Sequence, residues 1–229
     1  MSSLEISELV FANIQPISMT DPGMTGGSIV TLVRHFDRLL SKHVDEDISF
    51  ESRKYFTNDI IGATSILMNF QCGWNEIQEE QQRYQTSSTI LVFVDSLGFV
   101  LGKSLRTIKA ECEKIVVEIG AEHINLQVKQ VSSASTESCF DFESPGSKGS
   151  ICVSETLYHI DECQVQVASS YGVNSDASNI FPNHLLGNSN QSKFTNQLIG
   201  LTINNGSTSE DIPTVVTFMH DRIQVAFQK

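Results

Sequence analysis

The hydrophobic pattern changes its period part-way along the 229-residue chain. Before about residue 120, apolar side chains recur every three or four residues, as they do on one face of an α-helix. From His123 to Lys129 they alternate with polar side chains, as expected of a half-buried β-strand. One regular element cannot satisfy both periods. The pattern therefore predicts an α+β protein, with a helical bundle followed by short antiparallel strands.

Three helices are predicted in the first half. One covers about residues 28–42 behind Thr25-Gly26-Gly27-Ser28, a second begins at the candidate N-cap Ser49, and a third covers about residues 79–105. The third is apolar around most of its girth, so we expect it at the centre of the bundle. Gly98 and Gly102 lower its helix propensity, and close packing of this helix would compensate for them.

Alternation returns beyond the first strand, in Ser-, Asn- and Gly-rich surroundings. The further predicted strands are Cys163–Val167, Ile199–Ile203, Thr214–His220 and Arg222–Phe227. Short strands separated by such loops are typical of a sandwich or a barrel. We expect a lead-in segment at 1–23, a helical subdomain at 24–119 and a β-sandwich subdomain at 120–229.

The chain is acidic, since 15 Lys plus Arg stand against 27 Asp plus Glu and give a formal net charge of −12. Recognition of nucleic acids depends on clustered basic residues, so no nucleic-acid partner is expected. The first ten residues show no signal-peptide pattern. The longest apolar run, Ile90–Val94, is far shorter than the roughly 18 residues of a membrane helix.

The sequence contains only weak signals for catalytic or metal-binding groups. Ser154-Glu155, His159 and Asp161 lack the GxSxG turn and the glycine-rich oxyanion loop of a hydrolase. Asp161-Glu162-Cys163, with His159, lacks the second ligand pair of a zinc site. Asp45-Glu46-Asp47 lacks the glycine and distal glutamate of an EF-hand loop, and is interpreted as the exposed start of a helix. No catalytic residue, metal or cofactor is predicted.

The sequence offers candidates for two modifications. Cys139 and Cys152 flank the turn signal of Ser144–Gly149, so a bridge between them would close a hairpin in an oxidising compartment. It would contribute about 3 kcal/mol. Cys72 and Cys112 are interpreted as buried thiols, and Cys163 stays ambiguous. Asn190 and Asn205 head N-x-Ser/Thr sequons, which are glycosylation acceptors in secreted chains.

Four stretches in the same order resemble the GAIN domain of adhesion G-protein-coupled receptors, with the latrophilin branch nearest. They are Met24–Val30, then Trp74 with Gln81 and Val94–Leu105, then Ile124–Val128, and finally Leu198–Asn204 with Pro213–His220. The resemblance implies a helical subdomain followed by a β-sandwich that is incomplete at its C-terminus. It also implies structural roles for Trp74, Phe99 and His220. Trp74 could alternatively serve as a ligand platform, but a tryptophan at a helix start more often anchors neighbouring helices.

The chain departs from the family where self-cleavage would occur. The family cleaves itself at a His-Leu-Ser/Thr tripeptide, whereas His184-Leu185-Leu186 has no nucleophile at its third position. An acyl shift needs a hydroxyl beside the scissile carbonyl and a base within reach. We therefore expect no self-cleavage, and we expect that the sandwich would need further residues after Lys229 to close.

Two hypotheses follow for the function. The first is a non-enzymatic extracellular fragment of an adhesion receptor, with structural and regulatory roles in receptor signalling and cell adhesion. Its partners would be the rest of the receptor and the adhesive ligand of the parent protein, and only a missing C-terminal segment would reach the membrane. The second is a stand-alone soluble helical-plus-β protein-interaction module. Glycan occupancy at Asn190 or Asn205 would separate the two, because only a lumenal chain is modified there.

Overall fold

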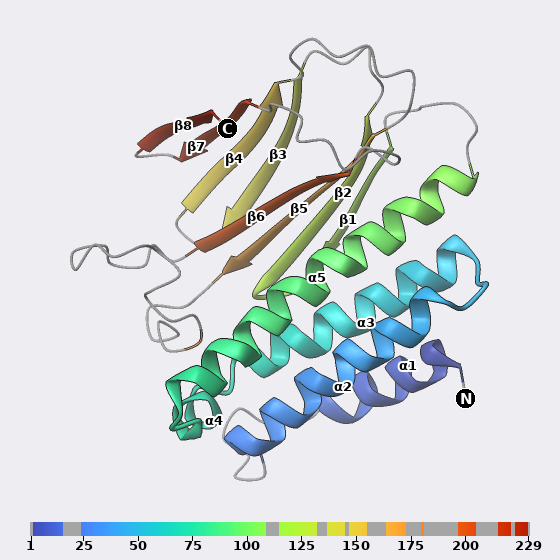
Figure 1. Cartoon of the computed structure of the whole chain (residues 1–229), viewed down its shortest axis with the longest axis vertical. Coiled ribbons are helices and arrows are strands. Elements are labelled where there is room, and N and C mark those ends of the chain that lie inside the picture. The colour runs from blue at the N-terminus through green and yellow to red at the C-terminus, as the bar shows by residue number, and fades with distance from the viewer. Residues whose placement is uncertain are drawn as a thin grey trace.

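The computed structural model describes residues 2–15, 24–108, 115–131, 137–144, 147–154, 164–172, 180, 197–204, 215–220 and 223–228. Within these residues five helices precede eight strands (Figure 1). All the strand pairs are antiparallel. The predicted α+β class is confirmed.

The predicted helices are present with bounds close to those expected. The helices are α1 (Ser3–Ile14), α2 (Gly26–Val44), α3 (Phe50–Met68), α4 (Gln71–Glu76) and α5 (Glu80–Ile108). Thr25 caps α2 by accepting a hydrogen bond from the Ser28 backbone N–H, and Ser49 caps α3 by accepting one from Ser52. Each cap satisfies one of the backbone donors that a helix start leaves open.

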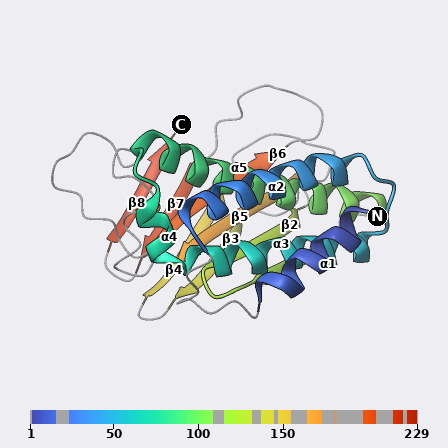
Figure 2. The ribbon, with the colours of Figure 1, turned by 90° about the horizontal axis from the view of Figure 1, so that it is seen from below.

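The first helix was not predicted, since residues 1–23 were expected only to lead into the bundle. Ser2 and Glu5 form a capping box at the start of α1, each side chain accepting from the other's backbone N–H. α1 packs mainly on α3, where the Phe11 ring occupies the space left by the absent side chain of Gly62. It lies on the side of the bundle away from the sheets (Figures 1 and 2).

The strands form two four-stranded sheets. The first sheet has the order β1 (Ile115–Gly120), β2 (Ile124–Val131), β5 (Gln164–Gly172) and β6 (Gln197–Asn204). The second sheet has the order β3 (Glu137–Ser144), β4 (Ser147–Ser154), β7 (Val215–His220) and β8 (Ile223–Gln228). β1 falls before the predicted boundary at residue 120 but pairs with β2 along its whole length. Where the subdomains divide stays a prediction, and so does closure of the two sheets into a sandwich.

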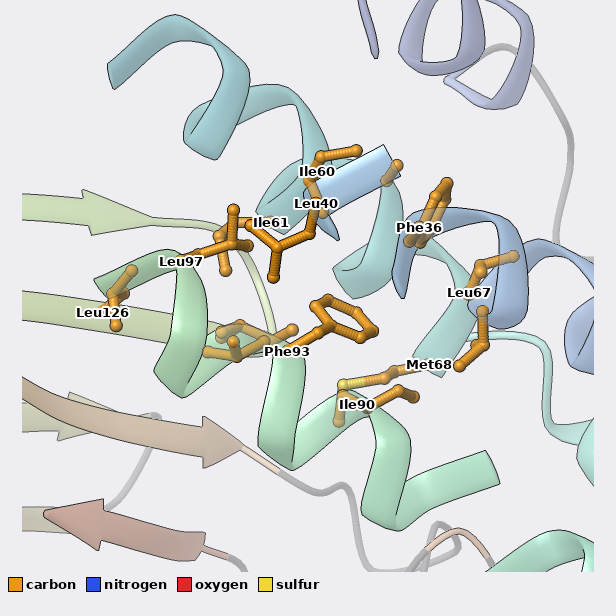
Figure 3. Close-up of a cluster of buried hydrophobic side chains, with 14 of the residues drawn as sticks. Phe36, Leu40, Ile60, Ile61, Leu67, Met68, Ile90, Phe93, Leu97 and Leu126 are labelled. Atoms are coloured by element: carbon orange, nitrogen blue, oxygen red, sulfur yellow. The ribbon is translucent and has the colours of Figure 1, made fainter. Parts of the chain in front are cut away.

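The core lies between the helices and one face of the first sheet. Phe93 of α5 is at its centre and meets Phe36 of α2 edge-on, with ring centroids 6.3 Å apart (Figure 3). Side chains of α3 and Leu126 of β2 surround this pair. The predicted central position of the third helix is therefore confirmed, because α5 contacts α2, α3, β2 and β5.

α5 is also, among the described helices, the one that is long and apolar enough to cross a membrane, over Glu80–Leu105. No such segment is predicted from the sequence, because its longest unbroken apolar run is only Ile90–Val94. Ile90, Phe93, Val94 and Leu97 of this helix are buried in the core. Length and composition alone do not distinguish a central core helix from a membrane span.

Candidate functional site

The candidate bridge between Cys139 and Cys152 joins neighbouring strands of the second sheet. The two residues lie directly opposite each other in the register of β3 and β4. Their α-carbons are 4.0 Å apart, and their sulfur atoms are bonded at 2.07 Å. Cys152 is buried and Cys139 is half-buried. The bond fastens the β3–β4 hairpin at its middle.

Two side chains of β2 connect the first sheet to this hairpin. The Lys129 ammonium donates a hydrogen bond to the Cys139 carbonyl and lies 4.3 Å from the centroid of the Phe140 ring. Gln127 donates from Nε2 to the Asp141 carbonyl at 2.6 Å. Lys129 and Gln127 are both buried, so these contacts satisfy polar groups that would otherwise be costly to remove from water. They are direct contacts between the two sheets.

Polar contacts that are partly buried link the end of α3 to the turn between β1 and β2. The Ser65 hydroxyl accepts from the His123 backbone N–H at 2.8 Å, and Asn69 Nδ2 donates to Glu122 Oε2 at 3.0 Å. Since Nδ2 is used on a carboxylate, Asn69 Oδ1 faces His123 and must accept from its Nε2–H. These contacts fix the register between the helical bundle and the first sheet.

The second contact between helices and sheet lies along α5. The Ser169 hydroxyl of β5 donates to Asp95 Oδ1 at 3.0 Å, and Ser169 is buried. Gly98 lies one turn further along, against Val167 of β5 and Leu126 of β2. Close packing of this helix is present at Gly98. The close neighbour is the sheet, which a helix-based pattern could not reveal.

Trp74 is fully buried within the helical part. Its indole Nε1–H donates to the Leu67 carbonyl near the end of α3 at 2.9 Å. α4, which carries Trp74, also packs against the start of α2, where the Gly73 carbonyl leaves no room for a side chain on Gly26. This geometry is that of an anchor between helices, and the buried ring offers no exposed face as a ligand platform.

A partly buried polar cluster, formed by Ser3, His43, Glu46 and Arg53, lies where α1, α2 and α3 meet. The Ser3 hydroxyl contacts His43 Nδ1 at 2.6 Å and also donates to Glu46 Oε2. The Ser3 backbone N–H donates to Glu46 Oε1 at 3.0 Å. From α3, Arg53 donates to the His43 carbonyl at 3.1 Å and to the Glu46 carbonyl at 2.7 Å. The cluster thus connects the start of α1 to the end of α2.

The cluster corrects the interpretation of Asp45-Glu46-Asp47 as the exposed start of a helix. Asp45 is the C-cap of α2, and the half-buried Glu46 carboxylate binds the N-terminus of α1 instead. Negative charge at a helix N-terminus is favourable there because of the orphan N–H groups and the helix dipole. The contact joins residues 43 apart in the chain. The available signal was the spacing of His43 from Phe36 and Leu40, which places it on the buried helix face.

Ser3, His43 and Glu46 have the residue types of a catalytic triad but a different geometry. In a triad the carboxylate orients the imidazole through the nitrogen that does not face the serine. Here Glu46 binds the serine, and His43 Nε2 is buried without a hydrogen-bond partner among the described residues. Ser3 and His43 are also almost completely buried. The cluster can therefore hold helices together but cannot present a nucleophile to a substrate.

Several candidate residues lie outside the described part of the chain. They are Asn190, Asn205, His159, Asp161, Glu162, Cys163, Cys112 and His184-Leu185-Leu186. Ser154 lies in β4, and His220 ends β7 opposite Gly149 and Ile223, but their side chains are not described. Phe99 is half-buried against the core, and Cys72 has a free, exposed thiol rather than the buried one expected.

The described residues contain no group of three or more His, Cys, Asp or Glu that could hold a metal ion.

Comparison with known proteins adds no family to this description. Neither a protein-family model nor a curated protein matches the chain. The function is therefore inferred from the geometry above and from the resemblance in the sequence.

Proposed function

We propose that this chain is a non-enzymatic extracellular module of the GAIN type, belonging to an adhesion-type receptor. The observation that carries the proposal is the disulfide between Cys139 and Cys152. Structural disulfides form and persist mainly in oxidising compartments such as the secretory pathway and the cell exterior. This environment is the one that the resemblance implies.

The arrangement of the described elements supports the same proposal. A helical bundle packs through α5 on one antiparallel sheet, and buried contacts of Gln127 and Lys129 lead on to a second sheet. Partly buried polar contacts at His123 and Asp95 hold the helices and the sheet in one relative position. A module of this kind is suited to a structural and regulatory role, in which a rigid body connects adhesive segments to a signalling receptor.

The proposal is tested by peptide mapping of the natural protein isolated from its own cells. Enzymatic removal of N-glycans in ¹⁸O-labelled water should convert Asn190 and Asn205 to labelled aspartate, because the released site takes its oxygen from water. A non-reduced digest should contain the peptide pair linked by Cys139 and Cys152. Unmodified asparagines together with free thiols at both cysteines would contradict an extracellular role.

The proposed module does not cleave itself, because His184-Leu185-Leu186 provides no hydroxyl nucleophile. Purified protein kept for days at neutral pH should remain one chain in denaturing electrophoresis and intact-mass spectra. Two stable fragments divided before a Ser or Thr would overturn this part of the proposal.

A stand-alone interaction module is the alternative, and the free exposed thiol of Cys72 favours it. Exposed free cysteines persist most readily where the environment is reducing. The same peptide map distinguishes the two functions, since a protein of a reducing compartment would carry neither glycan nor disulfide.

A further inference from the structure

The protonation state of His43 follows from the hydrogen bonds of Ser3. The Ser3 hydroxyl has one proton, and it donates this proton to Glu46, a carboxylate that can only accept. The short contact of 2.6 Å between Ser3 Oγ and His43 Nδ1 therefore requires a proton on Nδ1. Nε2 is then the bare nitrogen of the neutral ring.

Nε2 has no place for a proton in the folded bundle. It is buried and has no hydrogen-bond partner among the described residues, and the ring is stacked on Phe56 at a centroid distance of 3.7 Å. Protonating Nε2 would create a buried cation with an unsatisfied donor, which is costly. The imidazolium could regain water only if one of the covering elements moved away.

The charged groups around His43 add to this cost on balance. Burial contributes most to lowering the His43 pKa, to about 4, and the Arg53 guanidinium of α3 contributes next, while Glu46 opposes both. Lys42, on the same helix, pairs with Glu46 at 3.8 Å. Glu5, the first carboxylate within α1, accepts from the Ser2 backbone N–H, and Lys103 toward the end of α5 is exposed.

We propose that α1 is an acid-released helix, and that protonation of His43 detaches it from α2 and α3. α1 is the element whose movement would expose the imidazole at least cost, because it lies at the edge of the bundle and contacts it chiefly through α3 and the Ser3 cluster. Of its apolar side chains, only Ile14 belongs to the buried core. α5, by contrast, contacts both the other helices and the first sheet. Its displacement would open the whole core.

The sign of the effect follows from linkage. His43 has a lower pKa in the docked state than its ordinary value of 6.5, so docking is fully favoured above pH 6.5 and weakens as the pH falls toward 4. Lowering the pH from 7.5 to 5 should raise the population of released α1 by about 10- to 30-fold.

Titration of Asp59 opposes the release of α1 as the pH falls. Its carboxylate accepts from the Ser7 hydroxyl of α1 at 3.3 Å, and burial raises its pKa, with Glu8 adding to the rise and the Ser7 bond opposing it. A raised pKa favours the docked state as the pH falls. Asp59→Asn should therefore leave the acid release in place or enlarge it, whereas a change at His43 should remove it.

Hydrogen exchange measured by mass spectrometry on the full chain tests the proposal. At pH 7.5 and 5.0, with rates corrected for the intrinsic effect of pH, peptides from residues 2–15 should lose protection by about 10- to 30-fold at the lower pH. Peptides from α5 should keep their protection. His43→Gln cannot titrate, and should make α1 protection independent of pH. His35→Gln, an exposed position on the same helix, should behave as the unmodified chain.

Three results would overturn the proposal. One is equal α1 protection at both pH values, another is the same pH dependence in His43→Gln, and the third is joint loss of protection in α1 and α5. If His43→Gln does not fold, the imidazole C–H resonances of the unmodified protein decide by NMR. His43 should titrate well below pH 6.5, and titration at or above pH 6.5 would refute the mechanism.

Discussion

Gly98 of α5 lies so close to Val167 of β5 that a methyl group on the glycine would overlap the valine Cγ1 atom. Leu126 Cδ1 would be a further 3.2 Å neighbour of the same methyl group. The helix can approach the first sheet this closely only because residue 98 has no side chain. Gly98 therefore sets the distance between the helical and β parts.

Gly98→Ala should lower the free energy of unfolding by about 1–2 kcal/mol. Overpacking a tight contact destabilises the fold by roughly 1–3 kcal/mol. The better helix propensity of alanine offsets up to about 1 kcal/mol of this loss. Urea denaturation followed by circular dichroism would measure the change. Gly27→Ala is the matched control, because its methyl group would meet only Thr25 Oγ1 at 3.8 Å. A Gly98→Ala protein as stable as the control would show that the sheet can yield.

Trp74→Phe should lower the free energy of unfolding by about 2 kcal/mol. The change removes the hydrogen bond from Nε1 to the Leu67 carbonyl and leaves unfilled volume at a fully buried site. Since Trp74 is the only tryptophan, circular dichroism rather than fluorescence should follow the transition. Tyr55→Phe is the control, because the Tyr55 side chain is 62% exposed. Equal midpoints for both variants would contradict the anchoring role.

Replacing Cys139 and Cys152 together by serine should cost about 3 kcal/mol, the value expected for a loop of this length. Thermal denaturation should show a lower midpoint, and the intact protein should reach the same midpoint when a reductant is added. Cys72→Ser should leave the midpoint unchanged, because that thiol is free and exposed. Insensitivity of the intact protein to the reductant would show that the bridge contributes nothing to stability.

Glu46→Gln should weaken the docking of α1 at neutral pH, by about 1 kcal/mol, because a charged acceptor for the Ser3 N–H and hydroxyl becomes a neutral amide. The hydrogen bond from the Ser3 side chain is the main cause of the lowered pKa of Glu46. A lowered pKa gives stability that is present above pH 4.5 and is lost as the pH falls below it.

The difference between the Glu46→Gln protein and the unmodified protein should therefore shrink below pH 4.5. Urea midpoints at pH 7 and pH 3.5 would measure it, with Glu118→Gln at an exposed position of β1 as the control. A difference that stays constant over this range would show that the carboxylate charge is unimportant for docking.

The sequence predicted much of the helical part because local signals there agree with the tertiary structure. Thr25 and Ser49 mark helix starts through caps that involve only neighbouring residues, and the apolar girth of α5 indicated a central helix. The strand of residues 123–129 was likewise visible in its alternation, and the structure places β2 at Ile124–Val131. Each of these features depends on side chains close together in the chain.

The candidate site was less predictable because its contacts join distant residues. The bond between Ser3 and Glu46, the contact between His123 and Asn69, and the approach of Gly98 to Val167 connect different elements. α1 was missed because its short, mixed pattern gives no strong periodic signal. β1 was missed for a similar reason, and its place in the sheet depends on pairing with β2.

By itself the sequence determined the order of the fold, helices first and strands after, because hydrophobic period is a local property of the chain. It also placed Cys139 and Cys152 on either side of one turn, so that pairing as a hairpin would bring them together. Only the tertiary structure decided which face of α5 meets the sheet, why Gly98 is a glycine, and which charge holds α1. Those features arise where elements far apart in the chain exclude water together, and no short window of sequence contains both partners.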